Sequence, residues 1–178
     1  IGPGEVASPV ILAPMTAVTD LPFRRIVKRY GAGLTVSEMI ASQAMIRETR
    51  QSLQKAAWDR LEEPVSLQLA GCDPAQMAEA AKLNADRGAA IIDINMGCPV
   101  NKIVKNEAGA MWLKDPDKIY SIINKVQSVL DIPLTVKMRT GWSDPSLAVE
   151  NALAAEAARR LDLYSSDQAS NDATQRTG

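Results

Sequence analysis

Residues 91–102 read IIDINMGCPVNK, an apolar segment followed at once by a loop of polar and reactive side chains. Residues 91–94 predict a short buried strand. Gly97 and Pro99 cannot continue a strand ladder, so we expect the chain to leave the sheet around Cys98. In α/β proteins the loop beyond the carboxyl end of a strand is the usual place for chemistry. Cys98 is therefore a candidate reactive group, although a lone cysteine is more often a small buried apolar side chain.

The overall composition is typical of one soluble globular domain. The chain has 178 residues, 46 % of them hydrophobic, and a formal net charge of −1, which suits a single domain with a real core. This small charge gives no overall basic field of the kind that attracts nucleic acid. No apolar run is as long as a membrane span and no signal peptide opens the chain. We therefore expect a cytoplasmic protein in which Cys72 and Cys98 are free thiols.

The lack of histidine limits the chemistry open to Cys98. The sequence contains no histidine, which excludes a Ser-His-Asp triad, a Cys-His pair and a histidine-ligated zinc site within this chain. We expect no metal. A thiol without an imidazole partner tends to stay protonated at neutral pH. Cys98 is therefore better suited to donate a proton than to attack as a thiolate.

Strand-like and helix-like segments alternate about five times along the chain. Apolar segments predict strands at residues 10–13, 34–39, 65–69, 91–94 and 134–139. A helix capped by Thr19 or Asp20 is predicted to run to about residue 30, and further helices are predicted at residues 42–57 in one or two pieces, 74–87, 116–130 and 145–158. An aspartate before a proline opens three of these helices, as an N-cap with proline in the first helical position. This rhythm predicts a parallel sheet with right-handed crossovers, either doubly wound or arranged as a (β/α) barrel.

The parity of the polar residues favours the barrel. Polar side chains share one face of three strands: Ser66 and Gln68; Asp93 and Asn95; Thr135, Lys137 and Arg139. A strand covered by helices on both faces should be apolar on both, whereas a barrel strand turns polar on its inner face near the functional mouth. The chain also lacks the glycine-rich phosphate loop that would favour a doubly wound sheet. A simpler interpretation is that these groups satisfy one another, with Lys137 paired to Asp93 or Glu38.

Five motifs make the sequence resemble the tRNA-dihydrouridine synthases, flavin enzymes that reduce uridine in tRNA, and most closely their bacterial B-like branch. In chain order they are residues 13–20, APMTAVTD; 37–39, SEM; 67–69, LQL; 93–99, DINMGCP; and 136–139, VKMR. The resemblance covers roughly residues 1–158, and Asn-x-Gly-Cys-Pro is its most specific part. It implies a (β/α)8 TIM-barrel fold, of which this chain carries about the first five β/α units.

The resemblance also implies a cofactor and the residues that hold it. The backbone of Pro14, Met15 and Thr16 would lie against the isoalloxazine ring of FMN. Gln68 would hydrogen-bond the polar edge of the flavin. Lys137 would face the pyrimidine end of the ring, where an ammonium stabilises the negative charge that builds up on reduction. NADPH would be the reductant.

Three further residues would act on the tRNA substrate, by the same resemblance. Asn95 would orient the target uracil, and Arg139 would help to hold it. Cys98 would protonate uracil C5 while the flavin gives hydride to C6, which agrees with the conclusion drawn from the missing histidines. The uridine would have to leave its stack to reach the flavin.

The match to the family ends near Ala158. Residues 159–178 are mostly small and polar, and we expect a disordered tail there. The expected organisation is a partial FMN-binding catalytic barrel at residues 1–158 and a non-matching tail at 159–178, as a frameshift or truncation would produce. Five strands cannot close an eight-stranded barrel, so we expect this chain alone to bind FMN poorly and to be inactive.

Two other interpretations remain open at this point. One is a barrel flavoprotein acting on a free pyrimidine, similar to dihydroorotate or dihydropyrimidine dehydrogenases, although residues 95–102 fit that class less well. The other is a non-catalytic remnant without flavin. Activity on tRNA against free uracil separates the two enzymes, and a flavin absorbance spectrum separates both from the remnant.

The local clusters of bases are interpreted as solvated faces rather than as an RNA site. They comprise Arg24, Arg25, Lys28, Arg29, Lys102 and Lys105. Of these, Lys102 and Lys105 lie beside the reactive loop.

Overall fold

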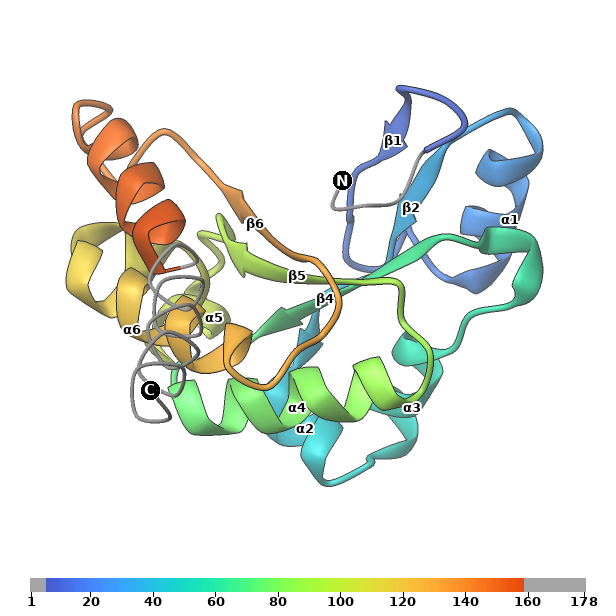
Figure 1. Cartoon of the computed structure of the whole chain (residues 1–178), viewed down its shortest axis with the longest axis horizontal. Helices are drawn as coiled ribbons and strands as arrows, with labels where there is room; N and C mark the ends of the chain where they lie inside the picture. The colour runs from blue at the N-terminus through green and yellow to red at the C-terminus, as the bar shows by residue number, and fades with distance from the viewer. Residues whose placement is uncertain (1–5, 159–178) are drawn as a thin grey trace, which may run out of the picture.

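The computed structural model describes residues 6–158, which form one curved sheet with helices around it (Figure 1). The strands are β1 Ile11–Leu12, β2 Leu34–Val36, β3 Ile40–Ala41, β4 Val65–Ala70, β5 Ile91–Met96 and β6 Leu134–Met138. The α-helices are α1 Leu21–Arg29, α2 Ser42–Ile46, α3 Arg50–Ala56, α4 Pro74–Asp86, α5 Asn101–Val104 and α6 Pro116–Gln127. Two 3₁₀ helices, η1 Arg60–Glu62 and η2 Gly109–Lys114, and a last helix at 147–158 complete the described part.

Every strand pairing is parallel, and the strands lie side by side in the order in which they occur in the chain. The order is β1-β2-β4-β5-β6, with the short β3 paired to β4. A doubly wound sheet would reverse this order at a switch point, and the described strands show no reversal. Sequential parallel order is that of a (β/α) barrel. The chain therefore has an α/β fold of the TIM-barrel type, as predicted, and forms a curved part of such a barrel.

Helices α1, α4 and α6 lie on the outer side of the curved sheet (Figure 1), and each begins at a side-chain cap. Asp20, Asp73 and Asp115 each accept a hydrogen bond from the backbone N–H three residues further on. Proline occupies the first turn of the three helices that follow, where its missing N–H costs nothing. These local signals explain why the starts of α4 and α6 could be predicted from the sequence.

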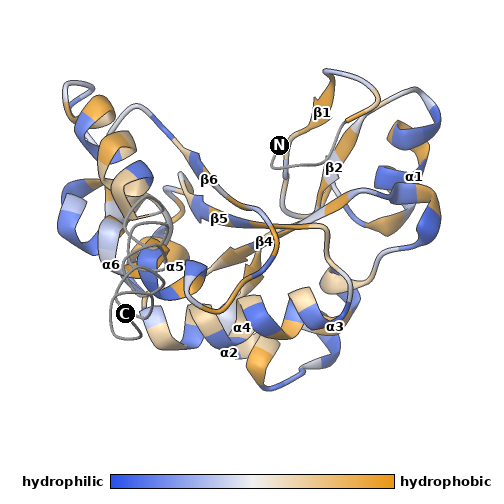
Figure 2. Ribbon diagram, viewed as in Figure 1, coloured by the Kyte–Doolittle hydropathy of each residue, from blue (hydrophilic) through white to orange (hydrophobic). Residues whose placement is uncertain are grey.

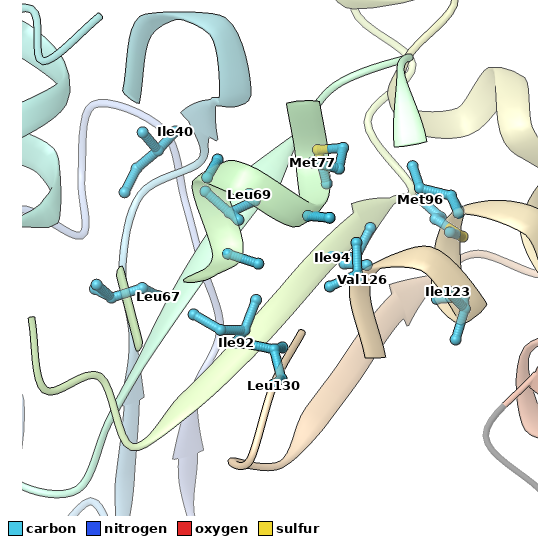
Figure 3. Packing of buried hydrophobic residues seen from close by; sticks show 14 of the residues in the cluster. Ile40, Leu67, Leu69, Met77, Ile92, Ile94, Met96, Ile123, Val126 and Leu130 are labelled. Carbon is cyan, nitrogen blue, oxygen red and sulfur yellow. The ribbon is translucent and has the colours of Figure 1, made fainter. Parts of the chain in front are cut away.

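The apolar core lies between the sheet and the helices that cover it (Figure 3). The register places Leu67 beside Ile92 and Leu69 beside Ile94, so apolar rows cross the strands. Helices α4 and α6 pack their own apolar residues against these rows: Met77, Ala80, Ala81, Ile119, Ile122, Ile123 and Val126. The four from α6 recur at the three- and four-residue spacing of a helix face. Burying one isoleucine or valine side chain stabilises the fold by roughly 1.5–3 kcal/mol.

Several element boundaries differ from the prediction for local reasons. The expected strand at 34–39 ends at Val36, because the Ser37 hydroxyl takes the N–H of Gln68 and interrupts the ladder. The central strand continues beyond Ile94 to Met96 and stops at the glycine that follows. The helical stretch at 42–57 is two helices, separated where Glu48 adopts a φ of +48°.

The last described helix and the loop after β5 also differ from the prediction. The expected helix at 145–158 begins at residue 147, and neither α5 nor η2 was predicted, since both lie in a loop with no helical periodicity. The expected polar tail at 159–178 lies outside the described residues.

Candidate active site

Polar side chains of three neighbouring strands form one hydrogen-bonded row on the inner face of the sheet, the face turned away from the helices. The register places Gln68 beside Asp93, and Asp93 beside Thr135. Gln68 Nε2 donates to Asp93 Oδ2 over 2.6 Å, and Thr135 Oγ1 donates to Asp93 Oδ1 over 2.6 Å. Asn95 Nδ2 donates to Gln68 Oε1 over 2.9 Å. These four polar residues thus satisfy one another, as the simpler interpretation proposed.

Asp93 is the charged member of this row and is only 6 % exposed. Burial raises the pKa of its carboxyl group above the ordinary value. The hydrogen bonds from Gln68 and Thr135 and the charge of Lys137 lower that pKa in opposition. The row therefore contains a carboxylate that is desolvated and held by directed hydrogen bonds.

The loop after β5 is held by Asn95 on one side and by η2 on the other. Asn95 Oδ1 accepts hydrogen bonds from the N–H groups of Gly97, at 3.2 Å, and Cys98, at 2.9 Å. The N–H of Ala110 donates to the Cys98 carbonyl over 3.0 Å. Gly109, at φ +61°, permits this approach, because an added Cβ would lie 2.7 Å from the Cys98 carbonyl oxygen. Cys98 is thereby presented as a half-buried free thiol at the carboxyl end of β5.

A cavity of about 780 Å³ lies beside Cys98, within the size range of small-ligand sites. Cys98 and Thr16 both line it, so the loops after β5 and β1 meet there. Its lining also includes Lys55, Lys102 and Lys105. Within residues 6–158, neither Lys102 nor Lys105 forms an ion pair. The cavity therefore combines the candidate reactive thiol with cationic side chains.

The loop after β1, which carries Met15 and Thr16, is fixed by two buried side chains. Thr19 Oγ1 accepts a hydrogen bond from the Met15 N–H, at 3.0 Å, and donates to the Met15 carbonyl, at 3.1 Å. Glu38 Oε1 accepts from the N–H of Ala17 over 2.6 Å. Ala17 has a φ of +65°, which a residue with a Cβ adopts at a cost. These contacts offset that cost and hold the loop in one conformation.

Arg24 lies beneath the same loop and is buried, so its interpretation as a solvated surface base was wrong. Its side chain is 1 % exposed. Nε donates to Glu62 Oε1 over 2.6 Å, Nη1 to the Thr19 carbonyl over 3.0 Å, and Nη2 to the Ala57 carbonyl over 2.7 Å. A buried charge needs such partners. The burial of Arg24 could not be predicted, because α1 contains several basic residues and the sequence does not show which of them pairs with Glu62.

Lys137 and Arg139 stand at the carboxyl end of β6 and are both exposed, and Figure 2 shows hydrophilic residues in this part of the strand. The register places Lys137 beside Asn95. Lys137 forms no ion pair within the described chain, so the expected pairing with Asp93 or Glu38 does not occur. Arg139 lines a separate cavity of about 250 Å³ with residues 140–145.

The predicted site residues are thus brought together in part. Gln68, Asn95 and Cys98 are joined by hydrogen bonds, and Thr16 shares a cavity with Cys98, whereas Arg139 lies apart from that cavity. Glu38, Thr19 and Arg24 complete the arrangement and were not predicted as site residues. Thr19 and Glu38 lie within the motifs at residues 13–20 and 37–39, which could have indicated them, whereas no sequence signal distinguished Arg24.

The residues expected to contact FMN suit a flat ring that becomes anionic on reduction. Met15 leaves 43 % of its surface exposed beyond β1, an apolar surface next to the fixed loop. Lys137 offers a cation that forms no ion pair within residues 6–158, although its charge acts on Asp93. Gln68, by contrast, is 1 % exposed and committed at both ends of its amide, so only one amide hydrogen remains for a ligand. Met15 and Lys137 thus have the chemistry that such a ring would need, whereas Gln68 offers it little.

Two kinds of feature are absent from residues 6–158. No helix in this range is long and apolar enough to cross a membrane. The same range contains no group of three or more His, Cys, Asp or Glu side chains placed to hold a metal ion.

The parallel strands follow one another in chain order, and the loop after β5 carries Cys98. These two features define a protein of the (β/α)-barrel class with its candidate active site at the carboxyl ends of the strands. A family model described as "Dihydrouridine synthase (Dus)" matches residues 11–159. The chain belongs to the dihydrouridine synthase family, which confirms the family predicted from the motifs.

Named relatives agree with this family and with its B-like branch. A "Probable tRNA-dihydrouridine synthase" of Rickettsia prowazekii is 54 % identical over 146 residues, covering 81 % of this chain and 44 % of that protein. A "tRNA-dihydrouridine synthase B" of Xanthomonas campestris is 49 % identical over 142 residues, covering 80 % and 43 %. A protein of the same name from Pseudomonas aeruginosa is 42 % identical over 178 residues, covering 94 % and 54 %. The chain spans about half the length of these curated relatives.

Proposed function

We propose that this chain supplies the flavin-binding and catalytic barrel of a tRNA-dihydrouridine synthase, an oxidoreductase that reduces the C5=C6 bond of uridine in tRNA. The observation that carries the proposal is the loop presenting Cys98 at the barrel mouth, held by Asn95 through hydrogen bonds to two backbone N–H groups. Membership of the dihydrouridine synthase family and the names of the relatives support the tRNA substrate.

Cys98 is proposed as the general acid that protonates uracil C5. Its thiol is half-buried and free, and the sequence has no histidine to draw off its proton. Asn95 would act on the uracil with its remaining amide hydrogen, since its other hydrogen and its oxygen are already bonded. Arg139 would contact the nucleotide from the end of β6.

FMN, reduced by NADPH, would supply the hydride for C6. The loop containing Pro14, Met15 and Thr16 would support the ring, and its conformation is already set by Thr19. Lys137 would stabilise negative charge at the pyrimidine end of the ring. Gln68 would border the ring with its last free amide hydrogen.

The cavity beside Cys98 supports a nucleic-acid substrate. Lys102 and Lys105 line it without an ion-pair partner in the described chain, and unpaired lysines are suitable partners for RNA phosphates. Lys55 lies at the same cavity, where Glu38 is 4.0 Å from its amine. The overall net charge of −1 therefore does not describe the local surface at the candidate active site.

The test uses a chimera, because the chain spans about half of its relatives. Residues 11–158 replace the matching segment of the Pseudomonas aeruginosa relative, and dihydrouridine formed in unmodified tRNA is measured by mass spectrometry. We expect flavin retention and turnover. Cys98→Ala should retain flavin and lose about 10²–10⁴-fold in turnover, as expected for removal of a general acid.

Cys72→Ala is the matched control and should leave turnover unchanged, since Cys72 is an exposed thiol after β4 to which the proposal gives no role in proton transfer. A folded, flavin-bound chimera without dihydrouridine formation would contradict the proposed function. Undiminished turnover in Cys98→Ala would contradict the role of the thiol. Reduction of free uracil but not of tRNA would favour the free-pyrimidine alternative.

A further inference from the structure

We propose that Asp93 is a positioning residue, which sets the orientation of two side-chain amides and, through them, the loop that carries Cys98. Nothing in the resemblance gives Asp93 a role. The inference deepens the proposed function by naming the group that prepares the thiol, and it rests on that function only where turnover is measured.

The direction of each hydrogen bond carries the argument. An ionised carboxylate can only accept hydrogen bonds, so Asp93 accepts one from the amide nitrogen of Gln68, at 2.6 Å. The oxygen of Gln68 therefore faces Asn95 and receives its amide nitrogen, at 2.9 Å. The oxygen of Asn95 is then left for the N–H groups of Gly97 and Cys98. A side-chain amide that turned over would place donor against donor at one end of this chain of contacts.

Burial decides where such a conflict would be felt. Asp93 is 6 % exposed and Gln68 1 % exposed, so water cannot satisfy an unpaired group at that end. Gly97 and Cys98 are only partly buried, and water can replace a side-chain acceptor there. A mismatch introduced at Asp93 should therefore be relieved by releasing the Cys98 loop.

Thr135 gives the means to introduce the mismatch. Its hydroxyl donates to the second oxygen of Asp93, at 2.6 Å, but a hydroxyl can also accept. Asp93→Asn alone can point its new nitrogen at Thr135 and keep its oxygen for Gln68. Thr135→Val alone leaves the carboxylate in place. In the double variant the amide nitrogen of Asn at position 93 can no longer donate to Thr135. The acceptors that the hydrogen-bonded row still offers it belong to Gln68 and Asn95, which lead to Cys98.

A compensating change at Gln68 should restore the polarity. In the Asp93→Asn, Thr135→Val background, Gln68→Glu offers oxygen both to the new amide nitrogen and to Asn95. Asn95 can then keep its orientation and continue to hold the loop. A third substitution would be expected to disturb the protein further if the effect were a general loss of packing. Recovery in the triple variant would therefore report the direction of the hydrogen bonds.

The experiment measures alkylation of Cys98 by iodoacetamide in the 178-residue chain, by peptide mass spectrometry, with the exposed Cys72 as internal reference. We expect each single variant, Asp93→Asn and Thr135→Val, to leave the Cys98/Cys72 rate ratio close to that of the wild type. The double variant should raise it about fivefold, the shift expected when a capping interaction of ordinary strength is lost. Adding Gln68→Glu should return the ratio to near the wild-type value.

A double variant whose ratio equals the product of the two single effects would overturn the proposal, and so would a triple variant that does not restore the ratio. If the double variant does not fold, the triple variant decides: a folded protein with the wild-type ratio supports the proposal, and an unfolded one refutes it. Alkylation needs neither flavin nor RNA, so its outcome is independent of turnover in the Cys98 chimeras. Turnover that follows the alkylation ratio in chimeras carrying the same variants would extend the role of Asp93 to catalysis.

Discussion

The two faces of β4 and β5 differ in character although alternating residues of the same two strands form them. The outer face is apolar and packs against α4 and α6 (Figure 3), whereas the inner face carries Gln68, Asp93 and Asn95 in one hydrogen-bonded row. Successive side chains of a strand point to opposite faces. A single strand can therefore contribute to stability on one face and to the candidate active site on the other.

The inner face of β4 and β5 buries polar groups at an energetic cost, which the apolar side chains on the outer face of the same two strands do not carry. Asp93 is desolvated, which raises the pKa of its carboxyl group, and the Ser66 hydroxyl is buried without a partner in the described residues. An unsatisfied buried polar group typically costs about 1–3 kcal/mol. The outer face offsets this cost by burying apolar side chains, so the two faces should respond differently to substitution.

The largest effect on stability is expected at the buried ion pair on the helix side. Arg24→Met leaves Glu62 as an uncompensated buried charge, which should lower the free energy of unfolding by about 3–5 kcal/mol. Glu62→Gln in the same protein should recover much of this loss. Urea unfolding of the 178-residue chain measures both, and a loss below about 1 kcal/mol in Arg24→Met would place the pair among ordinary surface salt bridges.

A paired substitution compares the two faces directly. Ile94→Ala, on the outer face, removes a side chain that is 1 % exposed and should cost about 2–5 kcal/mol in free energy of unfolding. Ser66→Ala, on the inner face, removes an unpartnered hydroxyl and should be neutral or slightly stabilising. Leu153→Ala, at a position that is 58 % exposed, is the surface control. Equal losses at Ile94 and Ser66 would contradict the division between the faces.

A smaller effect is expected from the free cation of the inner face. Lys137→Met should weaken FMN retention up to about fivefold, the effect of losing one exposed charge interaction, or lower the reduction potential of the bound flavin. Equilibrium dialysis and redox titration of the chimera measure these quantities. Lys125→Met, on the outer helix α6, is the control. Unchanged retention and potential in Lys137→Met would leave this lysine as an ordinary surface residue.

The pH dependence of stability should carry the signature of Asp93. Because burial raises its pKa above 3.8, the folded protein keeps a proton that the unfolded chain has already released. The stability that this proton contributes is fully present below the ordinary pKa of 3.8 and is lost as the pH rises through the pKa of the folded protein. The free energy of unfolding of the wild type relative to Asp93→Asn should therefore fall with rising pH, as urea titrations between about pH 3 and 7 measure. A difference that rises with pH would mean that hydrogen bonding outweighs burial.

The candidate site was predictable where one strand or one motif contains the information. The motif around Cys98 and the polar parity of residues 66–68, 93–95 and 135–139 indicated the loop and the inner face, because alternation along a strand is visible in sequence. The hydrogen bonds that join Gln68, Asp93 and Asn95 were not predictable in detail, since they depend on strand register. The cavity shared by Thr16 and Cys98 depends on the curvature of the sheet.

By itself the sequence determined the alternation of strands and helices, the helix starts at Asp73 and Asp115, and membership of the family, because caps, periodicity and motifs are local properties of the chain. Only the tertiary structure decided which base of α1 turns inward, that Lys137 remains unpaired within the described residues, and which way the amides of Gln68 and Asn95 point. Each of these depends on partners from distant segments, and a buried charge or amide is oriented by the partners that the fold brings to it.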